Sequence, residues 1–208
     1  MRILLKCALN ISTISISCLS MADEVSTISS HCKINEYAYL NANMAELHYP
    51  RYKTDEERRT KPGWILKRTG KFLSICADRQ TEPIGSLIYR YGKVGEVEFE
   101  KEATKLSPFY VFERSTSPHT GDNVFFFYVG LYTYCISEAT VQGSGISLTV
   151  LKAGKEIVSL FSGNDRGINY DAGLLDISFG TSKSPVLKEY PLANKFRTPC
   201  DGKRLMRP

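Results

Sequence analysis

The segment GSLIYRYGKVGEVEFEK, residues 85–101, predicts two antiparallel strands joined by a tight turn. In its first half Leu87, Tyr89 and Tyr91 occupy alternate positions, so they share one face of a strand. In its second half apolar residues alternate with three glutamates: Val97 and Phe99 against Glu96, Glu98 and Glu100. The sequence Gly-Lys-Val-Gly at 92–95 supplies the turn. These residues are therefore expected to form a β-hairpin with an apolar face and an acidic face.

Further strand-like runs follow the same style and are separated by Gly, Pro, Asn and Asp. They span residues 71–76, 109–113, 123–129, 131–137, 146–152, 155–161 and 174–179. Ala153-Gly154 predicts a second hairpin between two of these runs. Residues 124–128 are all apolar or aromatic, which favours a central strand covered on both faces.

This pattern predicts a mainly β protein, an antiparallel β-sandwich or barrel with a short helical N-terminal extension. The β domain is expected over residues 70–180 and a C-terminal tail over 181–208. Residues 23–69 are expected to form a partly helical extension, with one short helix at 38–48. Residues 51–61 mix basic and acidic side chains and are expected to be a solvated helix or loop rather than a phosphate-binding stripe.

The N-terminus is typical of a cleaved signal peptide, residues 1–22. Positive charge at Arg2 precedes an apolar stretch, and small residues at Ser20 and Ala22 suit signal peptidase. Lys6 interrupts the apolar stretch, which is too short for a transmembrane segment. An amphipathic N-terminal strand or helix, and a lipid anchor at Cys18, remain as alternatives. The predicted location is periplasmic or secreted.

Cleavage after Ala22 leaves four cysteines: Cys32, Cys76, Cys135 and Cys200. An even, widely spaced set favours two disulfides in an oxidising compartment. Three pairings are possible. The preferred one joins Cys76 to Cys135, which both lie in strand-like runs, and Cys32 to Cys200, which ties the tail back to the start of the chain. No CxxC and no histidine at ligand spacing accompany them, so no metal site is expected.

A recurring block, Ser74-Ile75-Cys76 followed by Tyr89-Arg90-Tyr91-Gly92 and by Val97-Glu98-Phe99-Glu100, resembles a group of small, uncharacterised exported bacterial proteins. These proteins carry a leading strand that ends in Cys, a YRFG-type hairpin and a VELE-type return strand. The resemblance covers about Lys71 to Phe161. It implies bacterial export and a β fold, and it carries over no catalytic residue. This chain has Phe161 where the group tends to carry a second cysteine, which leaves the partner of Cys76 open.

The sequence shows no catalytic constellation. His31, His48 and His119 stand in no metal-binding or zinc-hydrolase motif. Ser144 lies in a Gly-Ser-Gly turn between strands rather than in a strand-to-helix elbow. The loop 163–167 lacks the spacing of a calcium or nucleotide site. A non-enzyme without a cofactor is expected.

Binding to another protein is the favoured function. The formal charge of +5 falls to +3 without residues 1–22, which is too mild to indicate nucleic acid. The acidic row Glu96, Glu98 and Glu100 is the candidate site and would suit a basic partner. We expect an inhibitor or immunity protein that neutralises a cell-wall hydrolase or toxin. The alternatives are an envelope factor or a lipid- or sugar-binding β module, and a hydrolase with dispersed catalytic residues.

Overall fold

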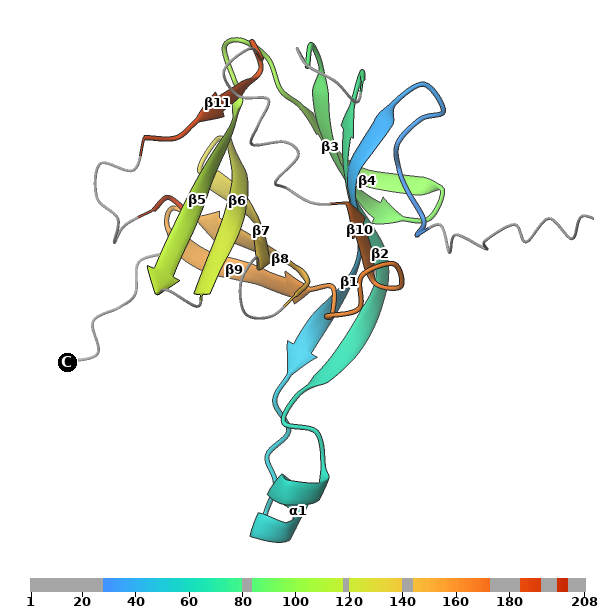
Figure 1. Cartoon of the computed structure of the whole chain (residues 1–208), viewed down its shortest axis with the longest axis vertical. Helices are drawn as coiled ribbons and strands as arrows, with labels where there is room; N and C mark the ends of the chain where they lie inside the picture. The colour runs from blue at the N-terminus through green and yellow to red at the C-terminus, as the bar shows by residue number, and fades with distance from the viewer. Residues whose placement is uncertain are drawn as a thin grey trace, which may run out of the picture.

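The computed structural model describes residues 28–79, 84–117, 120–139, 144–172, 184–191 and 198–201 (Figure 1). Within these ranges the chain forms one mostly antiparallel sheet of eleven strands and one short helix. The strands are β1 (Tyr37–His48), β2 (Ile65–Ala77), β3 (Leu87–Lys93), β4 (Glu96–Glu102), β5 (Phe109–Ser117), β6 (Thr120–Val129), β7 (Tyr132–Ala139), β8 (Ile146–Lys152), β9 (Lys155–Phe161), β10 (Tyr170–Ala172) and β11 (Leu187–Glu189), and the helix is α1 (Asp55–Thr60). No described helix has the length and apolar character needed to cross a membrane.

The strands follow the order β11-β5-β6-β7-β8-β9-β1-β2-β3-β4, and β10 pairs with β1 beside this path. Every pairing is antiparallel except that of β11 with β5. The two ends of the path, β4 and β11, do not pair with each other within the described strands. The expectation of a mainly β, antiparallel fold is confirmed, but in place of a closed barrel or two separate sheets there is one open sheet.

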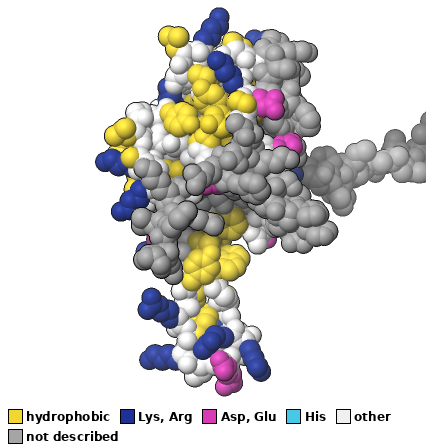
Figure 2. All heavy atoms as spheres, turned by 90° about the vertical axis from the view of Figure 1, so that its left-hand side faces the viewer, with side chains coloured by type: hydrophobic (Ala, Val, Ile, Leu, Met, Phe, Trp, Pro, Cys, Tyr) yellow, Lys and Arg dark blue, Asp and Glu magenta, His cyan; other side chains and the backbone are white. Residues whose placement is uncertain are grey.

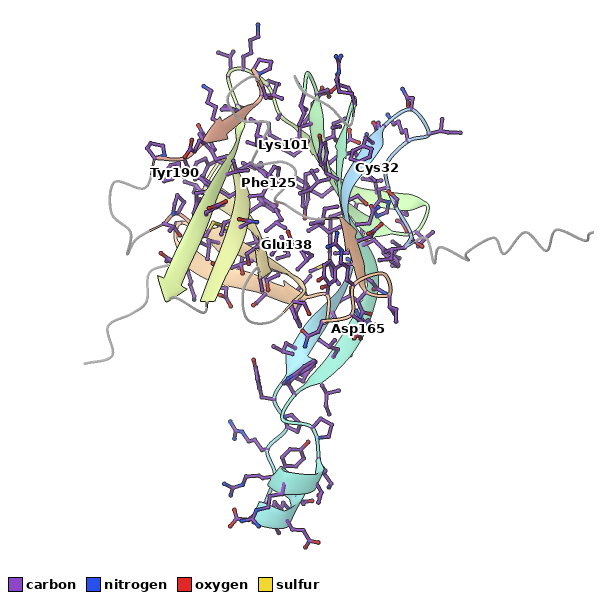
Figure 3. The ribbon with its side chains drawn as sticks, viewed as in Figure 1. Cys32, Lys101, Phe125, Glu138, Asp165 and Tyr190 are labelled. Carbon is purple, nitrogen blue, oxygen red and sulfur yellow. A yellow bond between two sulfur atoms is a disulfide. The ribbon has the colours of Figure 1, made fainter. Side chains whose placement is uncertain are left out.

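The main core lies between two halves of this sheet, which bends so that they face each other (Figure 1). One half holds β1 to β4, and the other holds β5 to β9 with β11. Phe99 of β4 stacks on Tyr134 of β7 with ring centroids 4.9 Å apart, and Tyr89 of β3 meets Phe127 of β6 at 5.1 Å. Figure 3 places Phe125 between the two halves. Aromatic pairs therefore hold the bent sheet together across its interior.

A smaller apolar cluster covers the outer face of β5 to β7. It contains Phe112, Val124, Phe126 and Cys135, with Tyr110, Tyr190 and Cys200 against it. Because Phe125 and Phe127 belong to the main core, β6 is covered on both faces, as the apolar run 124–128 predicted. The exception is Tyr128, which is 42% exposed.

The N-terminal part of the prediction was wrong. Residues 38–48 form strand β1 and not a helix, and the expected boundary at residue 70 falls inside β2. β1 pairs with β2, β9 and β10, and these tertiary pairings outweigh the modest helix propensity of its Ala, Leu, Met and Glu residues. The helix α1 lies instead at 55–60, where Thr54 caps it by accepting a hydrogen bond from the Glu57 amide. This placement agrees with the solvated helix or loop expected over 51–61.

The two disulfides join Cys32 to Cys76 and Cys135 to Cys200, so the preferred pairing was wrong. Cys76 lies between Ile75 and Ala77, which face the main core, and it therefore points to the outer face of its half. Cys135 points to the outer face of the other half. The core separates them, and Figure 3 shows Cys32 and Tyr190 on opposite outer sides of the molecule. Each chain end is tied to the outer face along which it runs, and two disulfides suit an oxidising extracytoplasmic compartment.

Candidate functional site

Residues 28–36, called the strap below, cross the outer face of β2 and β3 and bind a buried arginine there. The Arg90 side chain is 2% exposed and lies between two carboxylates. Its Nη1 and Nη2 donate to both oxygens of Glu36, and its Nε donates to Glu100 at 2.6 Å. The hydrogen bond from Arg90 holds the pKa of Glu36 below its ordinary value, against the opposing effect of burial. The strap is thus fixed by a charged clamp as well as by a disulfide.

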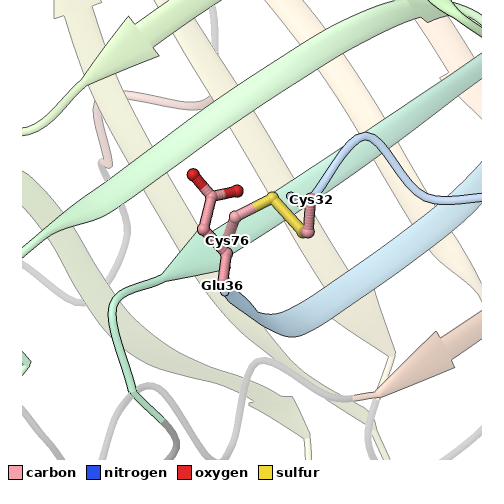
Figure 4. Close-up of side chains that lie close together, drawn as sticks. All are labelled: Cys32, Glu36 and Cys76. Carbon is pink, nitrogen blue, oxygen red and sulfur yellow. A yellow bond between two sulfur atoms is a disulfide. The ribbon is translucent and has the colours of Figure 1, made fainter. Parts of the chain in front are cut away.

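Cys32, Glu36 and Cys76 lie close enough together to suggest a metal site (Figure 4). The two sulfur atoms are bonded to each other, so neither is available as a thiolate ligand. The Glu36 carboxylate is already occupied by Arg90. This group acts as a structural clamp of the strap.

The predicted acidic row does not form one face. A β-bulge between Tyr91 and Gly92 shifts the register of β4 and places neighbouring glutamates on opposite faces of the sheet. Glu100 pairs with Arg90 on the outer face. Glu98 pairs with Lys71 at 2.6 Å on the inner side, where the Lys71 ammonium also lies over the Tyr91 ring.

Glu96 lies opposite Lys93 at the end of the hairpin. The three glutamates are therefore not brought together as an acidic surface, and two of them are already paired. A basic partner is no longer suggested by this strand.

The other residues considered in the sequence have structural contacts. His31 donates its amide to Ser74 Oγ, and its Nε2 lies 3.1 Å from the Gly92 carbonyl oxygen. His48 meets Glu46, and Ser144 Oγ donates to the Asn164 carbonyl oxygen. His119, the signal segment 1–22 and the strand expected at 174–179 lie outside the described residues.

Among the described carboxylates, those with a shifted pKa are all shifted downward. The pKa of Glu57 falls because Lys61 hydrogen bonds to it, and Glu36 behaves in the same way with Arg90. For Asp78, burial raises the pKa, but the amides of Ser86 and Gly85 outweigh it. A general acid needs the opposite shift, so these groups do not support the hydrolase alternative. The expectation of a non-enzyme stays a prediction.

The most distinctive feature of the molecule is a projecting arm, residues 46–68. It consists of the end of β1, the helix α1 and the start of β2, and it extends away from the sheet (Figure 1). No residue of the arm is buried. The ladder between β1 and β2 runs out to the pair His48 and Ile65, so the arm is a continuation of the sheet and not a loose loop.

The arm concentrates the positive charge of the chain. It contains seven basic residues (Arg51, Lys53, Arg58, Arg59, Lys61, Lys67 and Arg68) against four acidic ones (Glu46, Asp55, Glu56 and Glu57), a net of +3. Residues 23–208 hold 25 basic and 22 acidic residues, so the remainder, 18 against 18, is neutral. Figure 2 shows Lys and Arg side chains around the lower end of the molecule, where the arm lies. The mild overall charge therefore hides a strongly basic element.

Exposed aromatic and apolar side chains accompany these cations. Tyr49 is 70% exposed, Ile65 50% and Trp64 41%. Among the described residues the side chains of Arg51, Lys53 and Arg59 form no ion pair, whereas Arg58 and Lys61 pair with Asp55 and Glu57. Arginine, tryptophan and tyrosine are the residues that most often dominate binding at protein interfaces.

The root of the arm is held firmly to the body. Arg68 donates to the carbonyl oxygens of Asn43 and Ser162, at 2.8 and 2.6 Å, and to the side-chain oxygen of Asn169. Trp64 meets the ring of Phe161 edge to face, with centroids 6.4 Å apart. These contacts fix the direction of the arm before any partner binds, which reduces the entropy lost on binding.

Sequence reasoning recognised the mixed charges of residues 51–61 but not the arm. The missed signal is the combination of unpaired arginines with Tyr49, Trp64 and Ile65 in a segment that lacks a buried face. No protein-family model matches the chain, and searches among curated proteins and among solved structures found no match either. The case for function therefore rests on the geometry.

Proposed function

We propose that this chain is an exported, non-catalytic binding protein that inserts its arm into a cleft of another protein. The observation that carries the proposal is the exposure of the arm: a regular element without a buried residue that holds the whole net positive charge. Such an element contributes nothing to the core, so its side chains are available for a partner.

The partner that fits the arm carries an acidic cleft. The sequence alone favoured a basic partner for the strand Glu96–Glu102, but the arm reverses that sign. Exposed Arg and Lys side chains accelerate association with an acidic surface, while Tyr49 and Trp64 supply the apolar area that holds the complex. An inhibitor or immunity protein that blocks a cell-wall hydrolase or toxin acts in this way, and the two disulfides suit a body that must keep the arm rigid outside the cytoplasm.

Site-specific photo-crosslinking in cells that produce the full chain tests this proposal. A benzoylphenylalanine in place of Tyr49 lies on the arm, and the matched control in place of Val94, 64% exposed, lies on the turn between β3 and β4. We expect an adduct to one protein from Tyr49, identified by mass spectrometry, and none from Val94. Adducts from Val94 and not from Tyr49 would move the binding surface away from the arm.

A variant pair then tests the charge. Reversing Arg51 and Arg59 to Glu should weaken binding of the crosslinked partner, whereas reversing Lys93 and Lys188 to Glu, the same change of charge on the body, should leave it nearly unchanged. The alternative of a ligand-binding β module has support of its own from a pocket at the root of the arm.

A further inference from the structure

A pocket of about 460 Å³ opens at the root of the arm, between β2, β3 and β9. It is called the root pocket below. The side chains that carry the argument are Lys67, Arg68 and Lys71 from β2, Tyr91 from β3, and Val158 and Leu160 from β9. Its volume lies within the range of small-molecule sites.

The pocket arises from the way the sheet separates at this point. β9 pairs with β1 at Ala45 and Phe161 alone, so the two strands diverge beyond that pair. A second irregularity in β2 leaves Thr69 and Gly70 without partners between the pairs of Met44 and Ala45. β2 bends away from β9 there, and a wedge remains between the arm and the body.

The cations of the root pocket exceed its carboxylates. Arg68 binds only neutral oxygens, those of Asn43, Ser162 and Asn169, within the described part of the chain. Lys67 lies opposite Glu46 in the ladder and forms no ion pair with a described residue; the Glu46 carboxylate lies 3.2 Å from His48 Nε2 instead. Lys71 is paired with Glu98. The charges of Lys67 and Arg68 are therefore available to an anion.

The opposite wall is apolar, and hydroxyl groups lie between the two. Val158 and Leu160 pack against the main core and line the pocket. The Tyr91 hydroxyl lies beside the Thr69 side chain, and burial raises the pKa of Tyr91, so it remains a protonated donor. A ligand with both an anionic and an apolar part matches these three features together.

We propose that the root pocket binds a small anionic amphiphile, whose headgroup lies against Lys67 and Arg68 and whose alkyl chain lies on Val158 and Leu160. A carboxylate and a phosphate share the chemistry that this headgroup requires. The inference does not depend on the arm meeting a protein partner, because its residues lie at the root and not at the tip.

Chemical shifts of the ¹⁵N-labelled full chain should be followed during titration with octanoate, octyl phosphate, inorganic phosphate and the neutral octyl glucoside. We expect saturable shifts around the pocket with octanoate or octyl phosphate, and the stronger of the two identifies the headgroup. Inorganic phosphate and octyl glucoside should each bind at least about tenfold more weakly, because each lacks one half of the recognition. Lys67→Ala should weaken the anionic amphiphile by about tenfold, and Lys155→Ala, on β9 away from the pocket, should not.

Equal binding of octyl glucoside and octanoate, or indifference to Lys67→Ala, would overturn the proposal, as would the absence of saturable shifts. Equal effects of inorganic and octyl phosphate would reduce the site to a simple anion site and also contradict it. A variant in which Asn-Gly replaces residues 49–64 retains Lys67 and Arg68 and should still bind the amphiphile. That variant separates a failure of the pocket from a failure of the arm.

Discussion

Replacing Glu36 by alanine removes the main partner of the buried Arg90 and should cost about 3 kcal/mol of unfolding free energy. Removing one member of a buried ion pair typically costs 3–5 kcal/mol, because the remaining charge stays buried without compensation. The Arg90 and Glu36 side chains are 2% and 11% exposed. Glu100 and the His31 carbonyl oxygen still bind the guanidinium in the variant, so the lower end of that range applies.

Urea denaturation followed by far-ultraviolet circular dichroism measures this loss. With a slope of about 2 kcal/mol per molar urea, the midpoint should fall by about 1.5 M. The matched control is Glu100→Ala, since Glu100 binds the same arginine but its side chain is 51% exposed; it should cost about 1 kcal/mol or less. Replacing both Arg90 by Met and Glu36 by Leu should recover part of the loss. Equal costs for the two alanine variants would refute the view that Glu36 is the main compensating charge.

The other predictions concern pH, the disulfides, the bent sheet and the arm. The lowered pKa of Glu36 means that its contribution to stability is present above its ordinary pKa of 4.5 and is lost as the pH falls through the lower folded value; Glu36→Gln should therefore lose less stability than the wild type between pH 5 and pH 3, measured by urea midpoints. Opening the Cys32–Cys76 bridge by replacing both residues with Ser should cost about 4 kcal/mol, from the 44-residue separation, and peptide mapping without reduction should recover this pair and Cys135–Cys200. A double-mutant cycle on Phe99 and Tyr134, each changed to Leu, should give a coupling of about 1 kcal/mol across the bend, whereas a value near zero would mean that the two halves are not held together there. Replacing residues 49–64 with Asn-Gly should change the unfolding free energy by less than about 1 kcal/mol, because the ladder already ends at His48 and Ile65 and nothing in the arm is buried.

Local features of the fold could be predicted from the sequence, and long-range ones could not. The hairpins at 85–101 and 146–161 follow from alternation and from Gly-containing turns, which act within a few residues. The disulfide pairing depends on which outer face each cysteine reaches after the sheet bends, and no local pattern contains that information. β1 was mistaken for a helix because its three partner strands, and not its own residues, determine its conformation.

The candidate site shows the same division. The bulge at Tyr91 and Gly92 divides the acidic row, and a single extra residue in the register is invisible in an alternating sequence. The charges of the arm were readable, but its projection is a consequence of how far the β1–β2 ladder continues past the body. The root pocket needed residues from β2, β3 and β9 and was beyond reach without the structure.

The most direct test of the central claim is the affinity of the photo-crosslinked partner for the full chain and for the variant in which Asn-Gly replaces residues 49–64. Isothermal titration calorimetry on the two purified proteins gives both values. If the arm is the binding element, the variant should remain folded and lose at least about 100-fold in affinity, the loss of two or more dominant interface side chains. A folded variant that binds the partner as tightly as the full chain would contradict the account.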